Sequence, residues 1–245
     1  MKIESLEEKI RSHDEPELVL MYGPSGAGKT TLAGTFNVLG PVLFLDWDNK
    51  MKGLYGQHNI FVKSYAIKEP KDALSKFTAF KKDWKDLRNG KVLAPDGSPF
   101  KAVVIDSWTR LDTIAVTAMC QLAGKDPDVD KATLPVYGDL ISWYEMFQAQ
   151  LQGFKDMWVV VICHDHLKEN EEGGVKRIQP LITGRKFLDK FPTVFEEIWY
   201  IEKDRKGIPI LSFTAKDKTI CTTTTLEGTD PIKDPTFRSI MERIK

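Results

Sequence analysis

The chain has 245 residues, in which 35 Lys and Arg balance 35 Asp and Glu, and 42% of the residues are hydrophobic. This length suits one sizeable α/β domain, and a net charge of zero gives no indication of a nucleic-acid partner. No apolar run approaches the roughly 20 residues that span a membrane, and the first residues lack a secretory apolar core. Three scattered cysteines favour buried thiols in a reducing cytosol over disulfides or a zinc site. We therefore expect a cytoplasmic protein with a single domain over residues 1–245.

The N-terminal part of the chain contains a phosphate-binding motif. Residues 1–16 predict a surface helix, and Leu18 to Tyr22 form an apolar run of the length of a buried strand. The next residues fit G-x-x-x-x-G-K-[ST], in which glycines let N–H groups point at phosphate oxygens, the lysine contacts the β- and γ-phosphates, and the hydroxyl ligates Mg²⁺. A helix that begins near Thr30 would complete the strand, loop and helix of a nucleoside triphosphate site. Its predicted residues are Gly23, Pro24, Ser25, Gly26, Ala27, Gly28, Lys29, Thr30 and Thr31.

Two apolar strands end in acidic residues. The strand Val42 to Leu45 runs into Asp46-Trp47-Asp48, and the strand from Ala102 ends at Asp106. Acids just past a strand end lie at the carboxyl edge of an α/β sheet, where ligands bind. The second strand has the Walker B pattern, so we expect it beside the phosphate loop, with the Asp106 carboxylate holding Mg²⁺, usually through water.

The remaining elements alternate between helices and strands. The helix expected over 70–88 has one apolar stripe, and the lysines among its apolar residues indicate a solvated face. The aromatic residues of the helix expected over 137–154 are assigned to core packing. Further expected elements are strands at 60–62, 158–163, 197–202 and 208–215, a helix over 109–122, a short helix over 187–195, and a C-terminal tail over 226–245 with a helix from Pro235 to Ile244.

The strand at 158–163 leads into His164-Asp165-His166. A zinc site needs four ligands, and no second His/Cys cluster supplies them. We favour a γ-phosphate sensor at His164, with His166 as an alternative for that role, over a structural histidine. Zinc is the third alternative.

A charged loop occupies residues 168–186 and contains Lys176, Arg177, Arg185 and Lys186. Loops of this length inside a compact domain are usually functional or disordered. The segment 124–131 is a second polar stretch.

The order of these elements resembles the RecA-type recombinase core. In that comparison, Asp48 takes the place of the acid that activates the attacking water. The γ-phosphate sensor is the polar residue at the end of the strand expected over 158–163, which is His164. The segment 183–191 resembles the Gly-rich end of the second DNA-binding loop and its helix. Lys216-Asp217-Lys218 resembles the paired basic residues that reach across a subunit interface to the neighbour's γ-phosphate.

The resemblance is to the short, core-only RecA-like ATPases that bacteriophages encode and that are associated with recombination and single-strand annealing. It implies an α/β fold with a mostly parallel central sheet, flanking helices and C-terminal antiparallel strands. It also implies ATP and Mg²⁺ as cofactors and a homo-oligomeric ring or filament in the cytoplasm of a bacterial host. Single-stranded DNA is the implied partner, and the resemblance leaves open a single-strand-binding protein as a further one. The residues expected to contact DNA are Lys176, Arg177, Arg185 and Lys186.

Two other classes share the phosphate loop. The loop from Gly23 to Lys29 also looks like that of guanylate kinases, but those enzymes need arginine-rich acceptor and lid regions, and this chain has few arginines outside 168–205. A helicase-like or KaiC-like accessory ATPase has the same core and differs in its partner.

Overall fold

A computed structural model provides the structure. It describes residues 17–126, 130–154, 156–168, 177–183, 187, 190–215, 219–224, 226, 228 and 230–243, with the backbone alone for Lys168 and Arg177. The N-terminal helix predicted over 1–16 lies outside these residues.

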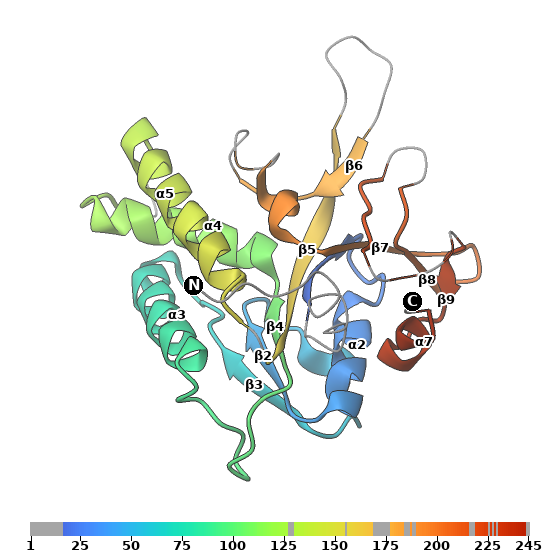
Figure 1. Cartoon of the computed structure of the whole chain (residues 1–245). Coiled ribbons are helices and arrows are strands. Elements are labelled where there is room, and N and C mark those ends of the chain that lie inside the picture. The colour runs from blue at the N-terminus through green and yellow to red at the C-terminus, as the bar shows by residue number, and fades with distance from the viewer. Residues whose placement is uncertain are drawn as a thin grey trace, which may run out of the picture.

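A central sheet organises the structure (Figure 1). Its strand order is β3-β2-β4-β5-β1-β7-β8-β9, and β6 pairs with β5 outside this path. The strands from β3 to β7 are parallel, whereas β8 and β9 are antiparallel, which confirms the predicted fold class. The strands are β1 (Leu18–Gly23), β2 (Val42–Asp46), β3 (Ile60–Ser64), β4 (Ala102–Asp106), β5 (Trp158–Lys168), β6 (Arg177–Pro180), β7 (Glu197–Lys203), β8 (Pro209–Ser212) and β9 (Ile232–Lys233).

Helices cover both faces of the sheet (Figure 1). The α-helices are α2 (Lys29–Gly34), α3 (Ala73–Arg88), α4 (Trp108–Leu122), α5 (Leu134–Leu151) and α7 (Phe237–Met241), and the 3-10 helices are η1 (Thr35–Leu39), η2 (Met51–Leu54), η3 (Pro70–Asp72) and η4 (Phe191–Val194). One apolar cluster joins α3, α4 and α5 to one face, and another joins α2, η1 and α7 to the other. Strands buried on both faces read as continuous apolar runs, which is why β1, β2 and β4 were recognisable in the sequence. No described helix has the length and apolar character needed to cross a membrane.

The aromatic residues of α5 are part of the core, as predicted. Trp143, Tyr144 and Phe147 are buried. They pack against aromatic rings of α3 and α4, with the Phe77 and Trp143 ring centroids 4.7 Å apart and the Trp108 and Phe147 centroids 5.4 Å apart. This cluster fixes the three helices as one layer against the sheet.

The carboxyl end of β4 lies beside the phosphate loop, as predicted, because Asp106 accepts a hydrogen bond from the Thr30 hydroxyl. The sequence did not specify the order of the strands, in which β5 lies between β4 and β1. Buried parallel strands have similar apolar sequences, so the sequence of β4 does not specify its neighbour.

The charged loop predicted over 168–186 differs from the prediction. Strand β5 continues to Lys168, and β6 returns antiparallel to it, with His166 opposite Gln179. Part of the expected loop is therefore a two-stranded arm, drawn above the sheet in Figure 1. Phe187 and Lys190 are helical and the 3-10 helix η4 follows them, in agreement with the short helix predicted over 187–195, whereas β8 ends three residues before the predicted limit at 215.

Candidate nucleotide-binding and hydrolysis site

The predicted phosphate loop connects β1 to α2. Gly23 ends β1 where a Cβ atom would lie 2.0 Å from the carbonyl oxygen of Ile201 in β7, so only glycine fits there. Gly28 precedes α2 with φ at +108°, a conformation that side chains rarely adopt. These two glycines let the chain turn sharply between strand and helix, as the motif requires.

Lys29 lies within this loop. Its side chain is buried, and Nζ donates hydrogen bonds to the carbonyl oxygens of Gly23 at 2.6 Å and Pro24 at 2.7 Å. Burial lowers the pKa of Lys29, and the charge of Asp106 opposes that shift. The ammonium group is therefore held at the turn where the motif places the β- and γ-phosphates.

Thr30 and Asp106 meet in space although 76 residues separate them. The Thr30 hydroxyl donates a 2.6 Å hydrogen bond to Oδ2 of Asp106. A hydroxyl and a carboxylate side by side are ligands that Mg²⁺ accepts, so these residues fit the ion, which would neutralise phosphate charge when bound. The pKa of Asp106 is raised to about 6, mainly by burial and in smaller part by the carboxylates of Asp48 and Asp46, while Thr30 and Lys29 oppose the shift.

Asp48 is placed by a turn that follows β2. Oδ1 of Asp46 accepts hydrogen bonds from the backbone N–H groups of Asp48 at 3.1 Å and Asn49 at 2.8 Å. Asn49 has φ at +55°, which asparagine tolerates better than most residues. On the Asp48 side chain, Oδ2 accepts a 2.8 Å hydrogen bond from the hydroxyl of Ser107, so both backbone and side chain are fixed.

His164 lies at the same edge of the sheet. It is beside Gly23 in the pairing of β5 with β1, and its Nε2 is 3.9 Å from Oδ2 of Asp48. Burial and the charge of Lys29 lower its pKa, which favours the neutral imidazole. His166 lies farther along β5 in the two-stranded arm and is exposed. The structure thus brings His164, not His166, next to Asp48.

Two further residues at this edge, Ser107 and Thr109, were not identified in the sequence. Ser107 binds Asp48 and also accepts the backbone N–H of Arg110 as the N-cap of α4. Thr109 accepts the N–H of His164 at 3.0 Å and donates to the carbonyl oxygen of Leu181 at 3.1 Å. A serine directly after a strand-ending acid and before a helix is a recognisable capping signal, but the Thr109 contacts join distant parts of the chain and leave no local pattern.

Asp112 supports the chain that follows β6. It is buried, and its Oδ2 accepts the N–H of Thr183 at 2.6 Å, while its Oδ1 has no hydrogen-bond partner among the described residues. Burial raises the pKa of Asp112 to about 6.

Several predicted residues lie outside the part of the chain that the structure describes. They are Lys176, Arg185, Lys186, Lys216 and Lys218, and of Arg177 only the backbone is described, in β6. Their roles stay predictions.

A glycine turn that leads from a buried strand into a helix, with its lysine and a hydroxyl–carboxylate pair at the carboxyl edge of a parallel sheet, is the arrangement of P-loop nucleotide-binding proteins. A family model described as "AAA domain" matches residues 15–230. The chain therefore belongs to this family of P-loop ATPase domains.

Comparison with solved structures gives a further similarity. The match is to a structure described as a prototypical ATPase from the type III secretion system of pathogenic bacteria, at 15% sequence identity and a TM-score of 0.40. It covers 78% of this chain and 53% of the other, so the chain spans about half the length of that protein. Comparison with curated proteins gave no significant match.

Proposed function

We propose that this protein is a Mg²⁺-dependent ATPase that acts on single-stranded DNA as a homo-oligomer, in the manner of the phage RecA-like proteins that its sequence resembles. The observation that carries the proposal is the direct connection between the sensor position and the basic arm. Strand β5 has His164 beside Gly23 of the phosphate loop and then continues as the first strand of that arm.

The residues at the sheet edge divide the tasks of phosphoryl transfer to water. Lys29 and the loop N–H groups bind the phosphates, and Thr30 and Asp106 hold Mg²⁺. Asp48 orients the attacking water, with its carboxylate held by Ser107. The neutral His164 donates a hydrogen bond to the γ-phosphate and loses this partner when the γ-phosphate leaves.

The contacts of α4 support communication between the two regions. Thr109 is bonded both to the backbone of His164 and to Leu181, which follows β6. A shift of His164 on hydrolysis would therefore reach the returning strand of the arm through one side chain. DNA bound by Lys176, Arg177, Arg185 and Lys186 would be held through its phosphates, which predicts salt-dependent binding with little sequence preference.

The experiment that tests the proposal measures the ATP hydrolysis rate with and without single-stranded DNA across a salt series. We expect DNA to stimulate hydrolysis and the stimulation to decline as salt rises. The Lys29→Ala variant is the control, because loss of the phosphate-binding cation should lower the rate by about 10²–10³-fold without DNA and with it.

Two outcomes would contradict the proposal. Hydrolysis with neither stimulation nor salt-sensitive DNA binding would favour an accessory ATPase with another partner. Transfer of the phosphoryl group to a nucleoside monophosphate, in place of water, would favour a nucleotide kinase.

A further inference from the structure

A groove between α3 and α5 lies outside the nucleotide site. Its volume is about 320 Å³. Helix α3 starts after the carboxyl end of β3 and ends before β4 begins, so its last turns lie toward the amino ends of the strands, away from the phosphate loop. The lining residues are Phe80, Lys81, Trp84, Lys85, Arg88, Asn89, Trp143, Met146, Phe147 and Gln150.

The charge of the groove is entirely positive. Lys81, Lys85 and Arg88 line it, and no acidic residue does. Lys85 and Arg88 are exposed, and within the described part of the chain none of the three cations forms an ion pair. These cations belong to the helix face that the sequence indicated to be simply solvated, and the structure shows that part of this face borders a cavity.

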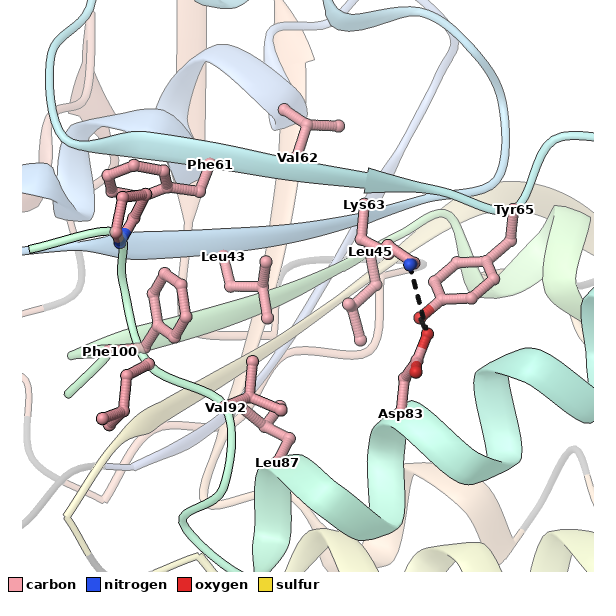
Figure 2. Close-up of a pocket in the computed structure, with 12 residues that line it drawn as sticks. Leu43, Leu45, Phe61, Val62, Lys63, Tyr65, Asp83, Leu87, Val92 and Phe100 are labelled. Carbon is pink, nitrogen blue, oxygen red and sulfur yellow. Dashed lines mark hydrogen bonds and ion pairs between the residues drawn. The ribbon is translucent and has the colours of Figure 1, made fainter. Parts of the chain in front are cut away.

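Three acids of the two helices are paired away from the groove, and the fourth, Asp139 of α5, is exposed and does not line it. Figure 2 shows Asp83 of α3 beside the apolar pocket next to β3, where it accepts a 2.7 Å hydrogen bond from the Tyr65 hydroxyl. The ion pairs are Asp83 with Lys63 at 3.8 Å, Asp86 with Lys91 at 3.9 Å, and Glu145 with Lys190 at 3.2 Å. The pocket in Figure 2 thus has polar groups that satisfy one another, whereas the α3–α5 groove presents cations without counter-charges.

The floor of the groove is aromatic but closed. Phe80, Trp84 and Phe147 are at most 2% exposed, and the Trp84 and Phe147 ring centroids are 4.8 Å apart, so these rings pack on one another. Nucleic-acid bases need open ring faces on which to stack. A closed aromatic floor instead accepts the side of an apolar residue, and Met146, which is 52% exposed at the groove, is flexible enough to adapt to it.

We propose that this groove binds an acidic peptide segment of a partner protein, with an apolar side chain seated on the aromatic floor and carboxylates paired with Lys81, Lys85 and Arg88. Charge complementarity selects the acids and the cavity selects the apolar residue. The proposal does not depend on the activity of the nucleotide site, because none of the groove residues belongs to it.

Fluorescence anisotropy with a labelled peptide of four aspartates followed by leucine and phenylalanine tests this proposal. We expect binding that weakens about tenfold with Lys85→Glu or Arg88→Glu and that declines as salt rises. Lys82→Glu is the matched control, because Lys82 is exposed on the same helix but does not line the groove, and it should change the affinity less than about twofold.

The apolar contact has its own variants. Met146→Ala should weaken the peptide several-fold, as should replacement of the peptide's leucine and phenylalanine by alanine. Leu134→Ala, at an exposed position at the start of α5, should have no effect. Thermal unfolding of each variant checks that the fold is intact.

The outcomes against the proposal are distinct. Absence of peptide binding, or equal weakening by Lys82→Glu and Lys85→Glu, would overturn it. Loss of oligothymidylate binding in the Lys85→Glu and Arg88→Glu variants, with no peptide bound, would assign the groove to nucleic acid. A change in oligomeric state in the same variants, with no peptide bound, would assign it to a second copy of the chain.

Discussion

At the scale of single residues, the position of Asp48 depends on its neighbours. Its backbone is fixed through Asp46, and its carboxylate is held by the Ser107 hydroxyl at 2.8 Å. An aspartate has a short reach, so a water that it orients must lie close to this fixed carboxylate. In the function that we propose, Ser107 is therefore a positioning residue that acts through Asp48.

We predict that Ser107→Ala lowers kcat for ATP hydrolysis by about 10–100-fold, since a small misplacement of a water-orienting group has a large effect on rate. The KM for ATP should change little, because Ser107 contacts neither Lys29 nor Thr30 in the structure. Steady-state kinetics measures both constants.

Ser107→Thr is the control, because it keeps the hydroxyl that binds Asp48 and caps α4. Loss of the cap alone should cost about 1 kcal/mol of the free energy of unfolding, which denaturation measures separately. A rise in KM with an unchanged kcat would contradict the positioning role.

We expect the buried Asp106 to lower the free energy of unfolding at neutral pH while it provides a carboxylate for metal binding. Its pKa is about 6 in the folded protein against 3.8 for an ordinary aspartate, because burial disfavours the charged form. Between these values the folded state binds more protons than the unfolded state, so the contribution of Asp106 to the free energy of unfolding declines as pH rises through this window.

We therefore predict that Asp106→Asn stabilises the nucleotide-free protein by about 1–3 kcal/mol near pH 7, with a difference that disappears below about pH 4. The same change should abolish Mg²⁺-dependent hydrolysis, because it removes the carboxylate ligand. Denaturant unfolding across pH and an activity assay with varied Mg²⁺ measure the two effects. Destabilisation of the variant at neutral pH would show that the ionised carboxylate is satisfied in the free protein.

At the scale of elements, α4 connects the nucleotide site to the arm. Its N-cap serine forms a hydrogen bond with Asp48. In the first turns of the helix, Thr109 bonds to His164 and to Leu181, and Asp112 accepts the N–H of Thr183. Contacts from a single rigid helix are a means by which two sites move together, although only a coupling measurement demonstrates it.

We predict that Thr109→Val reduces the stimulation of hydrolysis by DNA about 5–20-fold, while basal hydrolysis stays within about twofold, because coupling energies of this kind are typically 1–3 kcal/mol. The ratio of rates with and without DNA measures the effect. Thr113→Val is the matched control, since the Thr113 hydroxyl bonds only to a carbonyl of its own helix. Equal loss of stimulation in both variants would mean that the helix as a whole, not the Thr109 contacts, is responsible.

The elements differ in how far their sequence determines them. The β1–α2 loop was predictable because its glycines, Lys29 and Thr30 have fixed spacing within ten residues. The Thr30–Asp106 pair was predictable because P-loop proteins place a strand-ending acid near the hydroxyl that ligates Mg²⁺. The neighbour of β4 and the return of β6 beside β5 did not, because pairing depends on contacts across the whole sheet and not on local periodicity.

At the scale of the whole molecule, the sequence predicts that a segment with Lys216 and Lys218 completes a neighbour's site. Residues that flank this segment are fixed near the phosphate loop, where the Tyr22 hydroxyl accepts the N–H of Ile220 at 2.8 Å. Lys216 and Lys218 lie four and two residues before Ile220 in the chain. In a head-to-tail assembly they would act on the next subunit's γ-phosphate, the role of an arginine finger.

This arrangement predicts complementation between inactive proteins. The Lys216→Ala/Lys218→Ala protein and the Asp48→Ala protein should each hydrolyse ATP slowly alone. In an equimolar mixture, random assembly places an intact Asp48 next to a neighbour with intact lysines at about one quarter of the interfaces, so about one quarter of the activity should return.

Mixing Lys29→Ala with Asp48→Ala is the control, because both residues act within one subunit's site and no interface is complete. Recovery in the first mixture alone, rising with protein concentration as subunits assemble, is the expected result. Equal behaviour of the two mixtures at concentrations where the protein assembles would place Lys216 and Lys218 outside the shared site.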